Sequence, residues 1–274
     1  MRGLGEDFAG GWLRRLYWPV NPSGLWYAIL AAIALVLLHQ MLQAVLSLIV
    51  LKQFFGSDVS NTRELVKASL VAIFPASLAV ALAGWWLAGR RGSSAAEVLA
   101  LRPPKFTWLG WLVLILGFMT AMYLVIMSVV LVFGIDLAQY TPGPDGQSPK
   151  TGSAGLVKEA MFDIANEPLL FLIVFPSVAL GAPIAEEVIF RGQLFSALSS
   201  TRLGVSGTTL VTSALWALLH MSEPWLSVGL IFVMGLVFGW MMYRFGSLWV
   251  TIACHGAWNG TYALIIFGSL GSGT

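Results

Sequence analysis

The sequence predicts an all-α, polytopic transmembrane bundle of about seven spans. Hydrophobic residues make up 58% of its 274 positions and charged residues only 10%, whereas a soluble domain usually has about 25% charged residues. The chain therefore lacks the charge to cover a water-facing surface, and we expect the lipid bilayer to cover much of it. A net charge of +2 is too small to favour a nucleic-acid partner. The single cysteine, Cys254, excludes an internal disulfide.

Uncharged stretches long enough to cross a bilayer, about 17–25 residues, recur along the chain. Backbone hydrogen bonds must close within each span, so we expect helices. The apolar runs are too continuous for the alternating strands of a membrane barrel. In chain order, the predicted spans are 25–51, 68–88, 108–133, a run that starts at 169, 203–219, 225–243 and a last run that starts at 245.

The connection at residues 134–167 is the longest between spans. Its middle is dense in turn-forming Gly and Pro, and its last third can form a short surface helix. Loops of this length are often functional, so it is either a mobile cap or an inert linker. The chain is thus divided into an interfacial segment at 1–24, three spans within 25–133, an extramembrane loop at 134–167 and a four-helix core at 168–268.

The segment before the first span mixes aromatic and basic side chains. Phe8 and Trp12 alternate with Arg14 and Arg15, which is typical of an amphipathic helix at a membrane surface; a loosely ordered basic tail is the alternative. Lys and Arg in short loops set the orientation of membrane proteins. They are more numerous in the inner loops when the N-terminus is inside. We therefore expect a multi-pass protein of a bacterial inner (plasma) membrane with its N-terminus inside.

Polar side chains that carry chemistry cluster late in the chain, within the predicted spans. Ionisable groups are costly in lipid and indicate a functional site by default. A rise of about 1.5 Å per residue places these side chains at similar depths in three helices. A shared polar cavity would relieve the desolvation that each would suffer alone. They are Glu186, Glu187, Arg191, His220, His255 and Asn259.

Helical spacing suggests different tasks for these residues. Glu187 and Arg191 are four residues apart and can form a forked ion pair, which either holds the site together or is purely structural. Glu186 points about 100° away from Glu187 and stays unpaired within its own helix. It is therefore the better candidate for a general base. His255 and Asn259 are also four residues apart, and together they could donate hydrogen bonds to an oxyanion.

The motifs Glu186-Glu187-x-x-x-Arg191, Trp216-x-x-x-His220 and His255-x-x-x-Asn259 occur in this order. They resemble the motifs of the CAAX-processing and bacteriocin-immunity family (CPBP, Abi or type II CAAX prenyl endopeptidases) of intramembrane proteases. The resemblance covers about residues 165–265. It implies an endopeptidase that acts on membrane-associated or lipidated proteins or peptides.

The resemblance also implies roles for individual residues. Glu186 and His220 would activate a water, and His255 and Asn259 would stabilise the oxyanion. Glu187 and Arg191 would support the site. The second motif of the family usually begins with Phe, and the aromatic residue Trp216 stands in its place here, a change that mainly alters the shape of the pocket.

The family is often described as metal-dependent, but these residues do not require a metal. The sequence has no His-Glu-x-x-His motif. Glu186, His220 and His255 could hold zinc or could act without it. We favour a metal-free mechanism that requires no cofactor.

Two other kinds of function fit parts of the sequence. Gly204-Val205-Ser206-Gly207 matches the G-x-S-G of rhomboid serine proteases, in which Ser206 could pair with His255. That hypothesis leaves the glutamate pair and His220 without a role, and a serine at a helix start is often a cap. Alternatively, the cavity could be the proton or ion path of a transporter, or the chain a non-enzymatic scaffold or immunity protein. The intact set of polar residues argues against lost activity.

Overall fold

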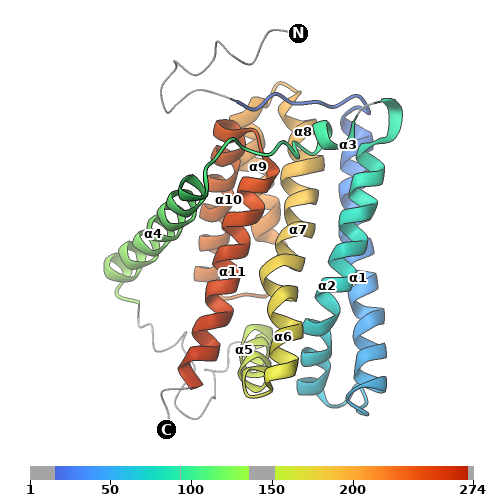
Figure 1. The fold of residues 1–274 in the computed structure, drawn as a ribbon, viewed down its shortest axis with the longest axis vertical. Helices are drawn as coiled ribbons and strands as arrows, with labels where there is room; N and C mark the ends of the chain where they lie inside the picture. Colours follow the sequence, from blue (N-terminus) through green and yellow to red (C-terminus); the bar gives the residue numbers. More distant parts are fainter. Residues whose placement is uncertain (1–15, 93, 136–151, 271–274) are drawn as a thin grey trace.

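The structure is a computed structural model, and it describes residues 16–92, 94–135 and 152–270. The described residues form helices and contain no β-strand (Figure 1), so the prediction of an all-α fold is confirmed. The elements are α1 (Leu25–Gln53), α2 (Thr62–Ala88), η2 (Arg90–Gly92), α3 (Ala95–Val98), α4 (Trp108–Phe133), α5 (Gly152–Ala165), α6 (Pro168–Pro176), η4 (Ser177–Gly181), α7 (Ala182–Glu187), η5 (Val188–Leu194), α8 (Phe195–Ser199), α9 (Gly204–Leu218), α10 (Trp225–Phe245) and α11 (Leu248–Leu270).

Five of the described helices are long and apolar enough to cross a membrane. They are α1, α2, α4, α10 and the continuous run Pro168–Ser199, which joins α6 to α8. The helix α9 is apolar but has 15 residues, and α11 has 23. The chain is therefore an integral membrane protein, while the count of seven spans stays a prediction. The second span begins earlier than expected because the Asn61 side chain accepts a hydrogen bond from the backbone N–H of Glu64 and caps α2 at Thr62.

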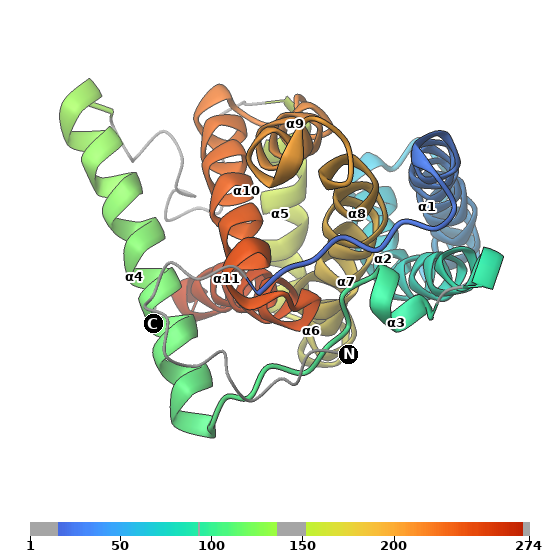
Figure 2. The ribbon, with the colours of Figure 1, turned by 90° about the horizontal axis from the view of Figure 1, so that it is seen from above.

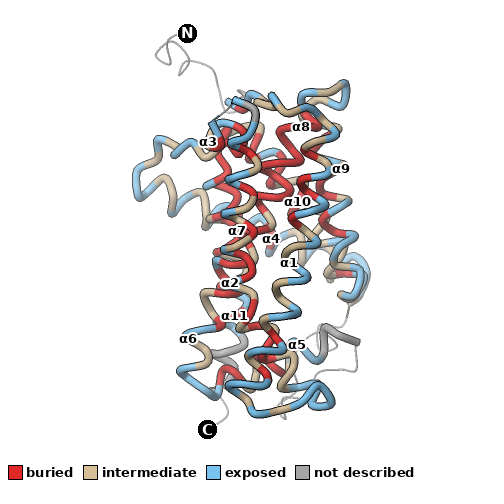
Figure 3. The backbone as a smooth tube through the Cα atoms, turned by 90° about the vertical axis from the view of Figure 1, so that its right-hand side faces the viewer, coloured by how far each residue is buried: buried red, intermediate tan, exposed pale blue. Residues whose placement is uncertain are grey.

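The bundle buries its inner helices and exposes large apolar side chains on its outer ones. Figure 3 shows buried residues gathered along α7 and α8 and many exposed residues along α1. Trp26 and Met41 of α1 and Leu131 of α4 are among the exposed apolar side chains. An apolar outer surface of this kind fits contact with lipid. The helix α4 slopes away from the other helices (Figures 1 and 2) and contacts them mainly through α11.

The N-terminal segment crosses the end of the bundle at which α8 and α10 end (Figure 2). The backbone N–H of Leu16 donates to the carbonyl of Tyr243 (3.0 Å), and the Ser196 hydroxyl donates to the carbonyl of Val20 (2.5 Å). The expected interfacial helix falls largely on residues 1–15, which lie outside the described residues. Residues 16–24 contain no helix.

The connection between α4 and α6 is partly helical. Residues 136–151 lie outside the described residues, and the expected surface helix is present as α5. Its buried residues Met161 and Ile164 pack in one cluster with Leu70 of α2 and Val174 of α6. An ion pair between Arg63 and Asp163 also joins α2 to α5.

The run Pro168–Ser199 lies at the centre of the bundle, as the expected fourth span. It contains two π-helical stretches, η4 and η5, on either side of α7. Prolines within the run remove backbone N–H donors, which disturbs the regular helical ladder. Stretches of π-helix occur frequently at functional sites. Here they flank the paired glutamates, and α7 contacts both α2 and α11.

Candidate active site

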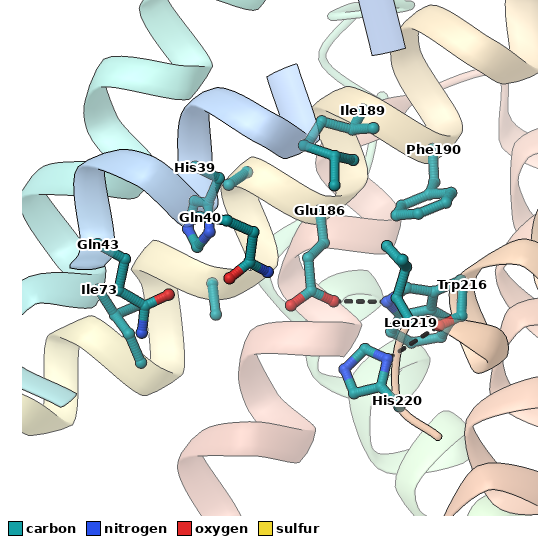
Figure 4. Close-up of a pocket in the computed structure, with 13 residues that line it drawn as sticks. His39, Gln40, Gln43, Ile73, Glu186, Ile189, Phe190, Trp216, Leu219 and His220 are labelled. Carbon is teal, nitrogen blue, oxygen red and sulfur yellow. Dashed lines mark hydrogen bonds between the residues drawn. The ribbon is translucent and has the colours of Figure 1, made fainter. Parts of the chain in front are cut away.

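A pocket of about 190 Å³ lies between α1, α7 and α9 (Figure 4). Most of its lining is apolar, and the polar side chains come from three separate segments of the chain. The lining residues are Val36, His39, Gln40, Gln43, Ile73, Ala182, Ala185, Glu186, Ile189, Phe190, Trp216, Leu219 and His220.

Glu186 is held in this pocket by the indole of Trp216. The Trp216 Nε1–H donates to Glu186 Oε2 at 2.6 Å, which is short for an N–H···O bond and typical of a charged acceptor. Trp216 is buried, so its own position is fixed by packing. The other carboxylate oxygen, Oε1, accepts no hydrogen bond from the described residues.

His220 lies just after the end of α9 and is held by the same tryptophan. The distance between His220 Nδ1 and the carbonyl oxygen of Trp216 is 2.9 Å. A carbonyl can only accept, so Nδ1 carries the proton and donates. In a neutral ring Nε2 is then an acceptor. Trp216 therefore orients Glu186 through its side chain and His220 through its backbone.

Glu187 and Arg191 form a second polar cluster, which is fully buried. Their side chains are 0% exposed, and Arg191 Nη1 donates to Glu187 Oε1 at 2.9 Å. The expected ion pair is present, but it is a single contact rather than a fork. The Arg191 guanidinium lies over the rings of Trp216 (4.4 Å) and Phe238 (5.2 Å), and such cation–π contacts stabilise a buried cation.

His255 belongs to this buried cluster. Its Nδ1 donates to Glu187 Oε1 at 3.1 Å, and its ring lies 5.2 Å from that of Trp216. Asn259 lies one turn further along α11, and its Nδ2 donates to the carbonyl of Val178 in η4 (3.3 Å). Neither His255 nor Asn259 lines the pocket of Glu186.

The expected single cavity is therefore replaced by two clusters that meet at Trp216. Glu186 and His220 lie on one side, and Glu187, Arg191 and His255 lie on the other. The physical reason is the helical repeat: successive residues point about 100° apart, so Glu186 and Glu187 face different neighbours.

Comparison with known proteins supports the family that the three motifs suggested. Residues 168–261 match the family described as type II CAAX prenyl endopeptidase Rce1-like. This region is Rce1-like. The matched residues include both polar clusters, so the predicted family and the prediction of a CAAX-type protease are confirmed. No curated protein and no solved structure matches the chain.

The Rce1-like region does not bring together the three residues of the alternative zinc site. The part of the chain that the structure describes holds no group of three or more His, Cys, Asp or Glu side chains that could hold a metal ion. Of these three residues, Glu186 and His220 share the pocket, while His255 bonds to Glu187. These positions do not fit a three-residue zinc site.

The geometry does not support the alternative of a rhomboid-like serine protease, in which Ser206 would pair with His255. Ser206 is exposed in the first turn of α9, whereas His255 is buried. No hydrogen bond joins the two among residues 16–92, 94–135 and 152–270.

The sequence motifs missed the contribution of α1, which lies outside the Rce1-like region. His39, Gln40 and Gln43 line the pocket from the side opposite Glu186 (Figure 4). Their polarity within an apolar span was the available signal. The sequence does not show which neighbouring helix this face of α1 meets.

Proposed function

We propose that the protein hydrolyses peptide bonds in membrane-associated or lipidated proteins or peptides, with a water activated by Glu186 and His220. One observation carries the proposal. Trp216 fixes one oxygen of Glu186 and one nitrogen of His220. The remaining acceptors, Glu186 Oε1 and His220 Nε2, belong to side chains of the same pocket and could bind one water together.

The reaction then follows from these acceptors. Glu186 takes a proton from the water while the water oxygen bonds to the scissile carbonyl carbon, and His220 Nε2 accepts the second O–H. The carbonyl oxygen becomes an oxyanion. Glu186 gives its proton to the amide nitrogen as the C–N bond breaks, which leaves a carboxylic acid and an amine. A positioned general base of this kind contributes about 10²- to 10⁴-fold to the rate.

His255 and Asn259 are our candidates for oxyanion stabilisation. Each already uses one donor, toward Glu187 and Val178 respectively. Asn259 retains a second amide proton, and His255 has an Nε2–H when its ring is protonated. Glu187, itself paired with Arg191, would hold the His255 ring in place. We propose that no metal or other cofactor is required.

The substrate and its setting are also part of the proposal. The family name points to prenylated CAAX C-termini, so a farnesylated peptide that ends in a CAAX motif is the first probe. The distribution of Lys and Arg favours an inside N-terminus, in what we propose is a bacterial inner membrane.

The test is cleavage of this peptide by the purified full chain in lipid vesicles. We expect Glu186→Gln to lower the rate at least about 100-fold, because the general base is lost. Glu97→Gln, at an exposed carboxylate in α3, and Ser206→Ala should retain the wild-type rate, and a metal chelator should have no effect.

Comparing the membrane proteomes of cells that hold wild type or Glu186→Gln would identify natural substrates. Full cleavage by Glu186→Gln would overturn the proposal. Loss of cleavage in Ser206→Ala alone would favour the serine dyad. Proton movement without cleavage of any peptide would favour a transporter.

A further inference from the structure

We infer that Gln40 of α1 binds the peptide backbone of the substrate across the pocket from Glu186. The inference rests on the proposed function and adds a substrate-binding residue from outside the Rce1-like region. Figure 4 shows Gln40 between His39 and Glu186.

The neighbours of Gln40 on α1 are occupied in joining α1 to α2. His39 Nε2 and the Ser77 hydroxyl are 3.0 Å apart. Gln43 Nε2 donates to the hydroxyl of Ser69 (3.1 Å) and to its carbonyl (3.3 Å). These bonds on both sides of Gln40 fix this turn of α1 against α2, and with it the wall of the pocket.

Gln40 differs from both neighbours because its amide has no hydrogen-bond partner within the described part of the chain. An amide without a partner is costly in an apolar environment, and a membrane-spanning helix has no free backbone groups to offer it. Gln40 is exposed and lines the pocket, so water or a molecule bound in the pocket can supply the partner that the protein does not.

The chemistry of the amide selects a peptide as that molecule. A glutamine side chain donates and accepts at the same end, as a backbone peptide group does. An extended peptide exposes alternate N–H and C=O groups that need such partners. The rest of the pocket wall near Gln40 is mainly apolar, including Val36, Ile73 and Ile189. Gln40 is thus placed to hold the chain while Glu186 acts on it.

The experiment compares Gln40→Met with Gln53→Met in the full-length protein in vesicles. Methionine keeps the length of the side chain and removes the amide. Gln53 is an exposed glutamine at the end of the same helix and does not line the pocket. With the farnesylated CAAX peptide, we expect Gln40→Met to raise KM about tenfold with kcat changed less than about threefold, and Gln53→Met to match wild type.

A binding measurement separates this inference from the proposed function. The dissociation constant of the same peptide is measured for the single variant Glu186→Gln and for the double variant that also carries Gln40→Met. We expect the dissociation constant of the double variant to be about tenfold higher. If wild type cleaves the peptide, and Gln40→Met changes neither KM nor the dissociation constant, the inference is wrong and the proposed function stands. If wild type fails to cleave but Gln40→Met weakens binding, the inference stands and the proposed function is wrong. Absence of peptide binding overturns the inference.

Discussion

Glu186 and Glu187 are neighbours on α7 with opposite surroundings. Glu187 is 0% exposed and contacts both Arg191 and His255. Glu186 is half-buried at a pocket and accepts one hydrogen bond, from Trp216. No cation of the described residues pairs with Glu186.

The difference shows how one short segment can hold both a buried ion pair and a carboxylate that is open to a pocket. A buried carboxylate needs opposite charge and hydrogen bonds, which Arg191 and His255 supply. A general base needs a free oxygen that can reach water, and the pocket leaves Glu186 that oxygen. One helical step of about 100° separates the two demands.

The largest expected effect comes from breaking the buried cluster. Glu187→Leu leaves the charge of Arg191 buried without its carboxylate partner, and we expect a loss of about 3–5 kcal/mol in the free energy of unfolding. Unfolding in detergent micelles, followed by circular dichroism, measures it.

Two variants sharpen this prediction. Glu186→Gln should change the free energy of unfolding by less than about 1 kcal/mol, because Glu186 is half-buried at a pocket and its replacement breaks no ion pair among the described residues. Adding Arg191→Leu to Glu187→Leu should recover part of the loss, because the unpaired charge is removed. Equal destabilisation by Glu186→Gln and Glu187→Leu would contradict the contrast between the two carboxylates.

A smaller effect is expected from Trp216→Phe, which restores the aromatic residue usual in the family. The phenyl ring keeps an aromatic face toward Arg191 and His255, and the backbone carbonyl still accepts from His220. The N–H to Glu186 is lost, together with one of the two fused rings of the buried indole. A hydrogen bond to a charged group contributes about 1.5–3 kcal/mol, so we expect kcat to fall about tenfold or more with little change in KM. An unchanged kcat would mean that Trp216 does not position Glu186.

The smallest effect is expected at the exposed ion pair between α2 and α5. The Arg63 side chain is 56% exposed and that of Asp163 is 24% exposed, so water screens their attraction. Arg63→Ala should lower stability by less than about 1 kcal/mol, and the loss should shrink further at high salt. The same unfolding assay at low and high salt measures this loss. If Arg63→Ala lowered stability as much as Glu187→Leu does, burial would not explain why the two ion pairs differ in their contribution to stability.

Much of the fold could be predicted because membrane helices have a strong local signature. Apolar length alone placed α1, α4 and the run Pro168–Ser199. The early start of α2 escaped prediction because Thr62 and the charged residues that follow it continue the helix beyond the uncharged stretch, and Asn61 caps it.

In the candidate site, contacts within one helix could be predicted and contacts between helices could not. The Glu187–Arg191 pair could be predicted because both residues lie on one helical turn. The bond from His255 to Glu187 and the place of Gln40 could not, since each depends on how separate helices are rotated toward one another.

The amino-acid sequence by itself determined the all-helical membrane fold, the family and the residues able to carry chemistry, because those depend on apolar length and on spacing within single helices. Only the tertiary structure decided that these residues divide into two clusters, that Trp216 orients both Glu186 and His220, and that α1 supplies a wall of the pocket. Contacts between helices far apart in the chain set these features, and no local pattern records how such helices are rotated against each other.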